Sequence, residues 1–137
     1  MNETNGQVMQ RAFDEIMKGG NVDAIDQLFA SDFTGHDTSG GTFGREEFRE
    51  GVLAMLSAFS DRQVEIADQV VNGDKVATRW TAIGVHSGEF NGIPATGRHV
   101  SMMGICIGRI GGGKIVESWE VTDDAGLLRQ LGVLPSA

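Results

Sequence analysis

An aspartate at the end of an apolar strand pattern is the strongest candidate for chemistry in this chain. Asp123 follows Ile115, Trp119 and Val121 at alternate positions, and this spacing predicts side chains that share one face of a strand. Charged groups lose hydration on burial, so an acid on the core side of a strand is partnered, protonated or used in chemistry. We therefore interpret Asp123 as a catalytic carboxylate that closes one end of a pocket and moves protons.

A capping role is the alternative for Asp123. Thr122, Asp123 and Asp124 all precede a helical pattern, and any of them can serve as its N-cap. Asp124 lies nearest to the helix and suits that role best. This assignment leaves Asp123 to point into the interior with Trp119, while Glu117 is expected on the same face, nearer to solvent.

The other reactive residue types give weaker signals. His36, His86 and His99 are far apart and lack the close spacing of zinc ligands, so no metal is expected. Each histidine is a candidate substrate contact or a structural residue. Cys106 lies among apolar neighbours, and a small buried thiol is its ordinary interpretation.

No cofactor site is expected. The stretch from Gly108 to Lys114 matches a phosphate-binding loop until Ile115, where that loop requires Ser or Thr. Strand patterns lie on both sides of it, so we interpret it as a hairpin turn. A dinucleotide fingerprint and a nucleophile elbow are also missing from the sequence.

Helical patterns occupy the first part of the chain. Apolar spacings of three and four predict one helix over residues 7–18, a second from Asn21 to Phe29 and a third with Phe48, Val52 and Phe59 on one face. Residues 32–37 are expected to form a brief extended piece. A short helix with Leu127, Leu128 and Leu131 is expected to end at Gly132.

Strand patterns fill the second half. Alternation and β-branched residues predict strands over 64–71, 75–86, 98–110 and 114–122, with a tight hairpin at Asn72-Gly73. Helices followed by a long meander indicate an α+β fold in which the N-terminal helices pack on a curved antiparallel sheet. Such a sheet forms a half-open cone, and its uncovered inner part is a common setting for a small-molecule site.

Composition limits the classes of partner. The 137 residues contain 40% hydrophobic residues, which suits a single domain spanning 1–137. The net charge of -8 argues against binding to nucleic acid. A membrane span and a secretion signal are not expected, so we expect a cytoplasmic protein.

Two segments resemble one protein family. The stretch Gly84–Arg98, and the ending with Gly113–Trp119, Asp123 and Gly126–Gly132, are similar to the SnoaL-like polyketide cyclases of the nuclear-transport-factor-2-like superfamily. The likeness covers nearly the whole chain. It implies a cone-shaped fold of that superfamily, a homodimer packed through the sheet and an apolar pocket for a flat aromatic polyketide.

The resemblance also implies a reaction. The family's proposed general acid and base matches Asp123, which would promote an intramolecular aldol ring closure without a cofactor. We expect Trp119, Trp80, Met103 and Phe59 to form walls for the substrate. Related cyclases tend to place a histidine on the penultimate strand, but the stretch Gly104–Ile107 has none here. His36 or His99 is therefore a candidate substitute, and His86 is a further candidate substrate contact.

Three alternatives remain open. Some relatives are proposed to hydroxylate anthracycline-type polyketides. Epoxide hydrolase-like enzymes of related shape use two aspartates and an arginine, for which Asp123 with Arg79 or Arg109 supplies part. A module that binds a small ligand without catalysis is the third alternative, since fold does not fix function.

Overall fold

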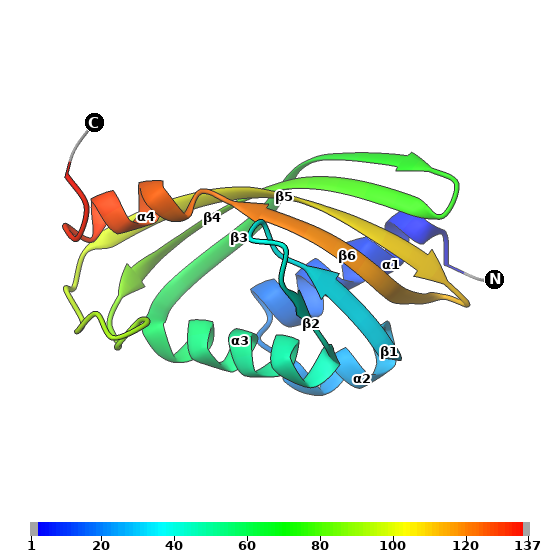
Figure 1. Cartoon of the computed structure of the whole chain (residues 1–137), viewed down its shortest axis with the longest axis horizontal. Helices are drawn as coiled ribbons and strands as arrows, with labels where there is room; N and C mark the ends of the chain where they lie inside the picture. Colours follow the sequence, from blue (N-terminus) through cyan, green and yellow to red (C-terminus); the bar gives the residue numbers. More distant parts are fainter. Residues whose placement is uncertain (1–2, 136–137) are drawn as a thin grey trace.

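The computed structural model describes residues 3–135, which form helices at the N-terminal end, a long sheet and a short C-terminal helix (Figure 1). In chain order the elements are α1 (Asn5–Ala12), η1 (Phe13–Lys18), η2 (Val22–Ala24), α2 (Ile25–Leu28), β1 (Phe29–His36), β2 (Thr42–Phe43), α3 (Arg45–Ala58), β3 (Phe59–Asn72), β4 (Lys75–His86), β5 (His99–Gly111), β6 (Lys114–Thr122) and α4 (Asp124–Gln130).

The first predicted helix is confirmed in extent, but it changes geometry along its length. Thr4 and Gln7 form a capping box at the start of α1, which satisfies two backbone donors there. The chain then continues as a π-helix, η1, which ends at Gly19. π-Helical turns are rare and occur frequently at functional sites, and Phe13 and Met17 of η1 both line a cavity beneath the sheet.

The sheet has the strand order β2-β1-β6-β5-β4-β3. β3 to β6 form the predicted antiparallel meander, whereas β1 lies parallel to β6. The prediction of a wholly antiparallel sheet is therefore wrong at this edge. The short extended piece expected near residue 32 is longer than predicted, since it begins at Phe29 and pairs with β6.

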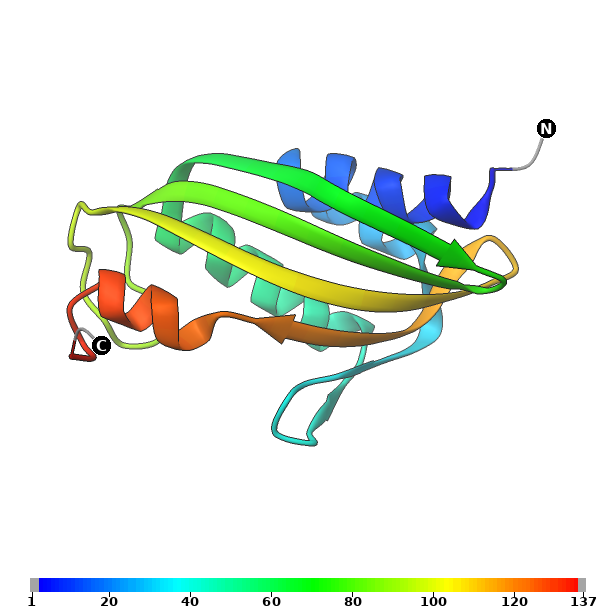
Figure 2. The same ribbon diagram turned by 90° about the horizontal axis from the view of Figure 1, so that it is seen from above.

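The helices cover one face of the sheet, and no helix within residues 3–135 covers the other face (Figures 1 and 2). Residues of α1, η1, α2 and α3 meet the inner face of the strands in one core, which contains Val8, Ile16, Ile25, Val52, Val76 and Ile115 among others. α4 closes one end, where Leu127 and Leu131 pack against Val100. This arrangement confirms the predicted α+β cone.

Two of the register irregularities in the sheet bear on which side chains face the helices. In β6, Arg109 pairs with Glu117 but Ile110 pairs with Ile115, which leaves Val116 as an extra residue. In β3, two residues, Asp61 and Arg62, oppose the single Gly84, and Asp61 has φ of 51°. Each extra residue is a β-bulge, which shifts the following side chains to the opposite face.

No helix within residues 3–135 is long and apolar enough to span a membrane.

Candidate active site

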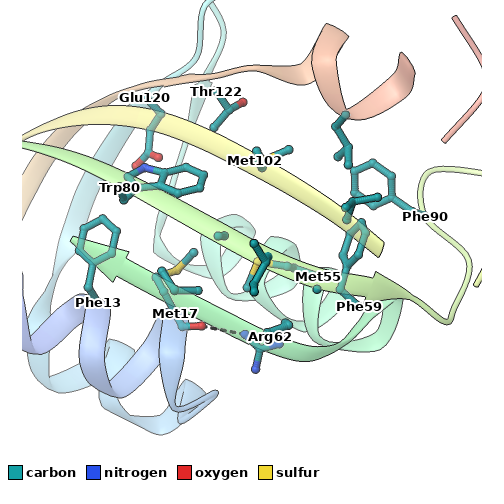
Figure 3. Close-up of a pocket in the computed structure, with 16 residues that line it drawn as sticks. Phe13, Met17, Met55, Phe59, Arg62, Trp80, Phe90, Met102, Glu120 and Thr122 are labelled. Carbon is teal, nitrogen blue, oxygen red and sulfur yellow. Dashed lines mark hydrogen bonds between the residues drawn. The ribbon is translucent and has the colours of Figure 1, made fainter. Parts of the chain in front are cut away.

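A cavity of about 270 Å³ lies between the inner face of the sheet and the helices (Figure 3). Its walls are mostly apolar, with aromatic and methionine side chains from η1, α3, the strands and α4. The lining residues are Phe13, Met17, Met55, Phe59, Arg62, Val64, Trp80, Ala82, Ile83, Gly84, Phe90, Val100, Met102, Glu120, Thr122 and Leu127. Apolar walls with a few polar groups are typical of small-molecule sites.

Among the described residues that line this cavity, Glu120 is the one acidic residue. The β6 bulge places it on the inner face, where it pairs across the sheet with Cys106 of β5. It also lines a second, smaller cavity of about 60 Å³, which shares Phe13, Met17 and Trp80 with the first. Glu120 therefore lies between the two spaces, with its carboxylate among apolar side chains (Figure 3).

Burial raises the pKa of the Glu120 carboxyl above its ordinary value, and a hydrogen bond from Ser118 lowers it by a smaller amount. Ser118 Oγ donates that bond to Glu120 Oε1 at 3.2 Å. A carboxyl whose pKa lies closer to neutral pH can both accept a proton and return it, as a general acid and base must.

Cys106 beside Glu120 is not poised as a nucleophile. Burial, with a contribution from the negative charge of Glu120, raises the pKa of its thiol to about 12. The thiolate is the reactive form of cysteine, so Cys106 remains a neutral thiol at physiological pH. The expectation of a small buried thiol is confirmed.

The raised pKa predicts how stability depends on pH. The folded protein favours the neutral Glu120 carboxyl, so the wild type loses stability as pH rises through this raised pKa. Replacing Glu120 with Gln removes that loss. We expect the Gln variant to melt at a higher temperature than the wild type at pH 8, and the two to converge below about pH 4, where unfolded glutamate is also protonated. Thermal melts from pH 4 to 8 measure this difference, and a gap that does not change with pH contradicts it.

Arg62 is the cation of the cavity among the described lining residues. The β3 bulge turns it inward, and its Nη1 donates a hydrogen bond to the Met17 carbonyl oxygen at 2.7 Å, which holds the end of η1 against β3 (Figure 3). Its stem passes beside Gly84, where a Cβ would lie 3.5 Å from Arg62 Cγ. The inner face of the sheet therefore contributes one carboxyl group, from β6, and one guanidinium, from β3, to the cavity lining.

Trp80 and Phe59, two of the expected substrate contacts, lie in the cavity wall. Trp80 on β4 faces Gly104 on β5, and a Cβ at Gly104 would lie 2.4 Å from the indole. The glycine therefore makes space for the tryptophan ring. Phe59 packs against Phe90 at a centroid distance of 5.2 Å, at the end closed by the loop after β4.

The structure does not place Asp123 in the cavity. It is exposed and is the N-cap of α4, where its Oδ1 accepts a hydrogen bond from the Gly126 backbone N–H at 3.0 Å. Asp124 lies within the first turn and accepts a hydrogen bond from Thr122 Oγ1 instead. The prediction that Asp124 is the cap and that Asp123 points into the pocket is therefore wrong. The helix begins one residue earlier than its apolar pattern indicates.

Trp119 and His36 lie on the outer face of the sheet, not in the cavity. Their rings stack at a centroid distance of 5.2 Å, and His36 Nε2 lies 2.8 Å from Glu117 Oε2. Hydrogen bonds from His36 and Arg109 lower the pKa of Glu117. The placement of Trp119 and Glu117 on the inner face is wrong because the bulge at Val116 reverses the alternation that starts at Ile115.

Met103 and His99 also lie outside the cavity. Met103 is exposed on the outer face, and its neighbour Met102 lines the cavity instead. His99 is exposed and lines a separate shallow groove near Gln130. The even-numbered residues of β5 point inward, and the sequence did not distinguish this phase because the middle of the strand is apolar at both sets of alternate positions.

His86 is fully buried but does not line the cavity. Its Nδ1 lies 2.9 Å from Thr96 Oγ1 and accepts a hydrogen bond from the Thr96 backbone N–H. Its own backbone pairs with Arg98 and Gly97. His86 thus fastens the two ends of the loop that carries Phe90, and the structural interpretation of this histidine fits its position.

The arginines considered for an epoxide hydrolase are on the wrong face. Arg79 is exposed, Arg109 binds Glu117 on the outer face, and neither of these arginines nor Asp123 lines the cavity. Within residues 3–135, no three His, Cys, Asp or Glu side chains are grouped so that they could hold a metal ion.

Comparisons with known proteins agree on one family. The family model for the SnoaL-like polyketide cyclase matches residues 7–131. Aklanonic acid methyl ester cyclase DnrD of Streptomyces peucetius is 37% identical over 90 residues, which cover 65% of this chain. The match covers only 62% of the length of DnrD, less than two thirds of that relative.

Solved structures extend the likeness to the whole fold. The candidate polyketide cyclase IdmH from Streptomyces antibioticus is 30% identical, with a TM-score of 0.85 over 96% of this chain and 100% of IdmH. The candidate hydroxylase AclR from Streptomyces galilaeus is 26% identical, with a TM-score of 0.89 over 97% of this chain and 83% of AclR.

Proposed function

This chain belongs to the SnoaL-like polyketide cyclase family, and we propose that it closes a ring in an aromatic polyketide, with Glu120 as general acid and base. The single observation that carries the proposal is a carboxyl of raised pKa in a mostly apolar cavity. This inner-face acid takes the role that the sequence pattern had assigned to Asp123.

The reaction would proceed as an intramolecular aldol addition. The Glu120 carboxylate removes the acidic proton from a carbon beside a carbonyl group, and the resulting enolate attacks a second carbonyl of the same molecule. The new alkoxide then takes the proton back from the Glu120 carboxylic acid, so the carboxylate is restored and no atom is gained or lost. Conjugation in the substrate delocalises the charge of the enolate.

The cavity supports this reaction in two physical ways. Its walls, with Trp80, Phe59 and Phe90, suit a flat conjugated molecule, because aromatic surfaces stack with favourable packing energy. Holding both reacting carbons in one folded conformation converts ring closure into a reaction between aligned neighbours. Exclusion of water by the apolar lining keeps the enolate from being protonated by solvent.

The direct test is incubation of the protein with aklanonic acid methyl ester, the compound in the name of the relative DnrD, and with its free acid. Ring closure gives a product of unchanged mass with a new retention time and spectrum. Binding without any new product would instead indicate a ligand-binding module, and would contradict the proposed reaction.

Hydroxylation is the second candidate, because the candidate hydroxylase AclR shares the fold at a TM-score of 0.89. Hydroxylation adds one oxygen atom to the substrate and consumes an oxidant. An increase in product mass, or oxygen uptake during turnover, would therefore favour hydroxylation over ring closure in the same incubation.

The outer face of the sheet supports a homodimer. Exposed apolar side chains lie next to one another across β4, β5 and β6: Ile83, Met103, Ile105, Ile107 and Val121. Exposed apolar patches on proteins mark interaction sites, and the family resemblance implies pairing through this surface. We propose that a second copy of the chain covers it.

Replacing Ile105 with Glu is expected to weaken self-association at least about tenfold, because a buried unpaired charge opposes the contact. Sedimentation velocity over a range of concentrations measures this change. Leu53→Glu is the matched control, since Leu53 is 47% exposed against 45% for Ile105 but lies on α3, across the molecule from this face. A monomeric wild type, or equal dissociation of both variants, would contradict the proposal.

A further inference from the structure

We propose that Arg62 binds an anionic carboxylate on the substrate, so that this protein prefers a carboxylic acid to the corresponding methyl ester. The inference rests on the proposed function and specifies its substrate class. It starts from the Arg62 guanidinium, which lies in the cavity lining among mostly apolar side chains.

The hydrogen bonds of Arg62 leave most of its donors free for a ligand. A guanidinium has five N–H donors, and within residues 3–135 the Arg62 guanidinium donates one hydrogen bond, from Nη1 to the Met17 backbone carbonyl oxygen. None of the ion pairs among these residues includes Arg62. A partly buried guanidinium without a carboxylate partner is costly unless a ligand supplies one.

The position of Arg62 separates this group from the reacting centre. Arg62 opposes Gly84 of β4, whereas Glu120 is aligned through Cys106 with Thr78 of the same strand. Those two positions are six residues apart on the strand, which is roughly 20 Å along the backbone at about 3.3 Å per residue. Figure 3 shows the two side chains reaching into the cavity from separate places on its wall. A ligand that contacts both would span much of the cavity, with its anionic group at the end away from Glu120.

Repulsion between Glu120 and an anionic group of the ligand favours the same orientation of the ligand. An anionic group near Glu120 would raise the pKa of that carboxyl further and weaken its action as a base, because like charges disfavour ionisation. An anionic group at Arg62 gains a charge-assisted, bidentate contact instead. The two charges would therefore fix which end of an elongated substrate enters first.

A structural role for Arg62 makes a different prediction. Since Arg62 Nη1 holds the Met17 carbonyl at the end of η1, its loss could lower stability without changing ligand preference. In that case charged and uncharged ligands would lose affinity by the same factor. The comparison between an acid and its ester separates the two roles.

The test uses isothermal titration calorimetry with anthraquinone-2-carboxylate and its methyl ester as probes. We expect the wild type to bind the carboxylate at least about tenfold more tightly, in line with the strength of charged hydrogen bonds. Arg62→Gln should remove this preference by weakening the carboxylate alone, and Arg62→Lys should retain part of it. Arg79→Gln, which changes an exposed arginine on the outer face, should change neither affinity.

Three results would overturn the proposal: equal binding of both probes by the wild type, failure of both probes to bind, or a preference that persists in Arg62→Gln. If Arg62→Gln does not fold, Arg62→Lys serves as the test instead. The preference for the carboxylate should fall in this variant if Arg62 makes the bidentate contact, and it should stay unchanged if Arg62 has only a structural role. Glu120→Gln should keep the preference for the carboxylate probe even though it loses ring closure. Failure of the proposed reaction and failure of this inference are therefore distinguishable.

Discussion

Replacing Glu120 with Gln is expected to reduce turnover at least about 100-fold while the protein remains folded, which is the contribution typical of a positioned general acid and base. The amide fills nearly the same volume but cannot accept the proton from carbon. Its neutral side chain suits the apolar surroundings, and the Ser118 hydroxyl can still donate to its carbonyl oxygen. Product formation and thermal melting, measured on the same preparation, distinguish lost chemistry from lost structure.

Asp123→Asn is the matched control, since it also replaces one carboxylate with an amide. Asn is as good an N-cap as Asp, so this variant should retain both turnover and stability. Asp123→Ala removes the hydrogen bond to Gly126 N–H and should cost about 1 kcal/mol of stability with turnover per folded molecule unchanged. A large loss of turnover in Asp123→Asn, with Glu120→Gln active, would return the catalytic role to Asp123.

The pH profile adds an independent check. Because the base form of Glu120 is needed, turnover should rise with pH through the raised pKa of this carboxyl. The acid limb of the wild type profile should therefore lie above the ordinary range for glutamate, about 4.3. An acid limb at or below that range would indicate that an exposed carboxylate, and not Glu120, acts as the base.

The fold could be predicted from the sequence because its signals are local and repeated. Spacings of three and four predicted α1 with η1, and also α3, while the hairpin at Asn72-Gly73 and the strand patterns predicted β3 to β6. The parallel pairing of β1 with β6 was not predictable in this way, since it joins segments far apart in the chain.

The site could not be predicted because both of its charged residues follow β-bulges. Alternation from Phe59 assigns Asp61 and Gln63 to the inner face, but the extra residue in β3 brings Arg62 inward. Alternation from Ile115 likewise assigns Glu117 and Trp119 to the interior, but the extra residue at Val116 brings Glu120 inward. A bulge has no fixed sequence pattern here, yet it reverses every assignment beyond it.

The apolar outer face of the sheet also made it impossible to tell from hydrophobicity which strand residues point inward. In β5 the outer residues Met103, Ile105 and Ile107 are as hydrophobic as the inner Met102 and Cys106. Alternation distinguishes two faces only when one of them is polar. One usable hint was present: Gly104 and Gly108 share one face of β5, and glycine in a strand marks the close approach of another group.

Gly104→Ala is expected to destabilise the fold by about 1 to 3 kcal/mol, the usual cost of overpacking, and to weaken ligand binding. The new Cβ would lie 2.4 Å from Trp80 Cζ2 and 2.8 Å from the Val121 carbonyl oxygen. The carbonyl belongs to the β6 backbone and cannot move away easily, so the indole must shift into the cavity that it lines. Chemical denaturation measures the first effect, and titration with anthraquinone-2-carboxylate measures the second.

Gly51→Ala is the control that separates contact with Trp80 from the change of residue type. Gly51 is exposed in the middle of α3, and a Cβ there meets nothing within 4 Å. Because alanine loses less conformational freedom than glycine in a helix, this variant should gain roughly 0.5 to 1 kcal/mol of stability and keep its affinity. The same methyl group thus has opposite effects at the two positions, and a Gly104→Ala variant with unchanged stability and affinity would show that Trp80 does not depend on the space left by Gly104.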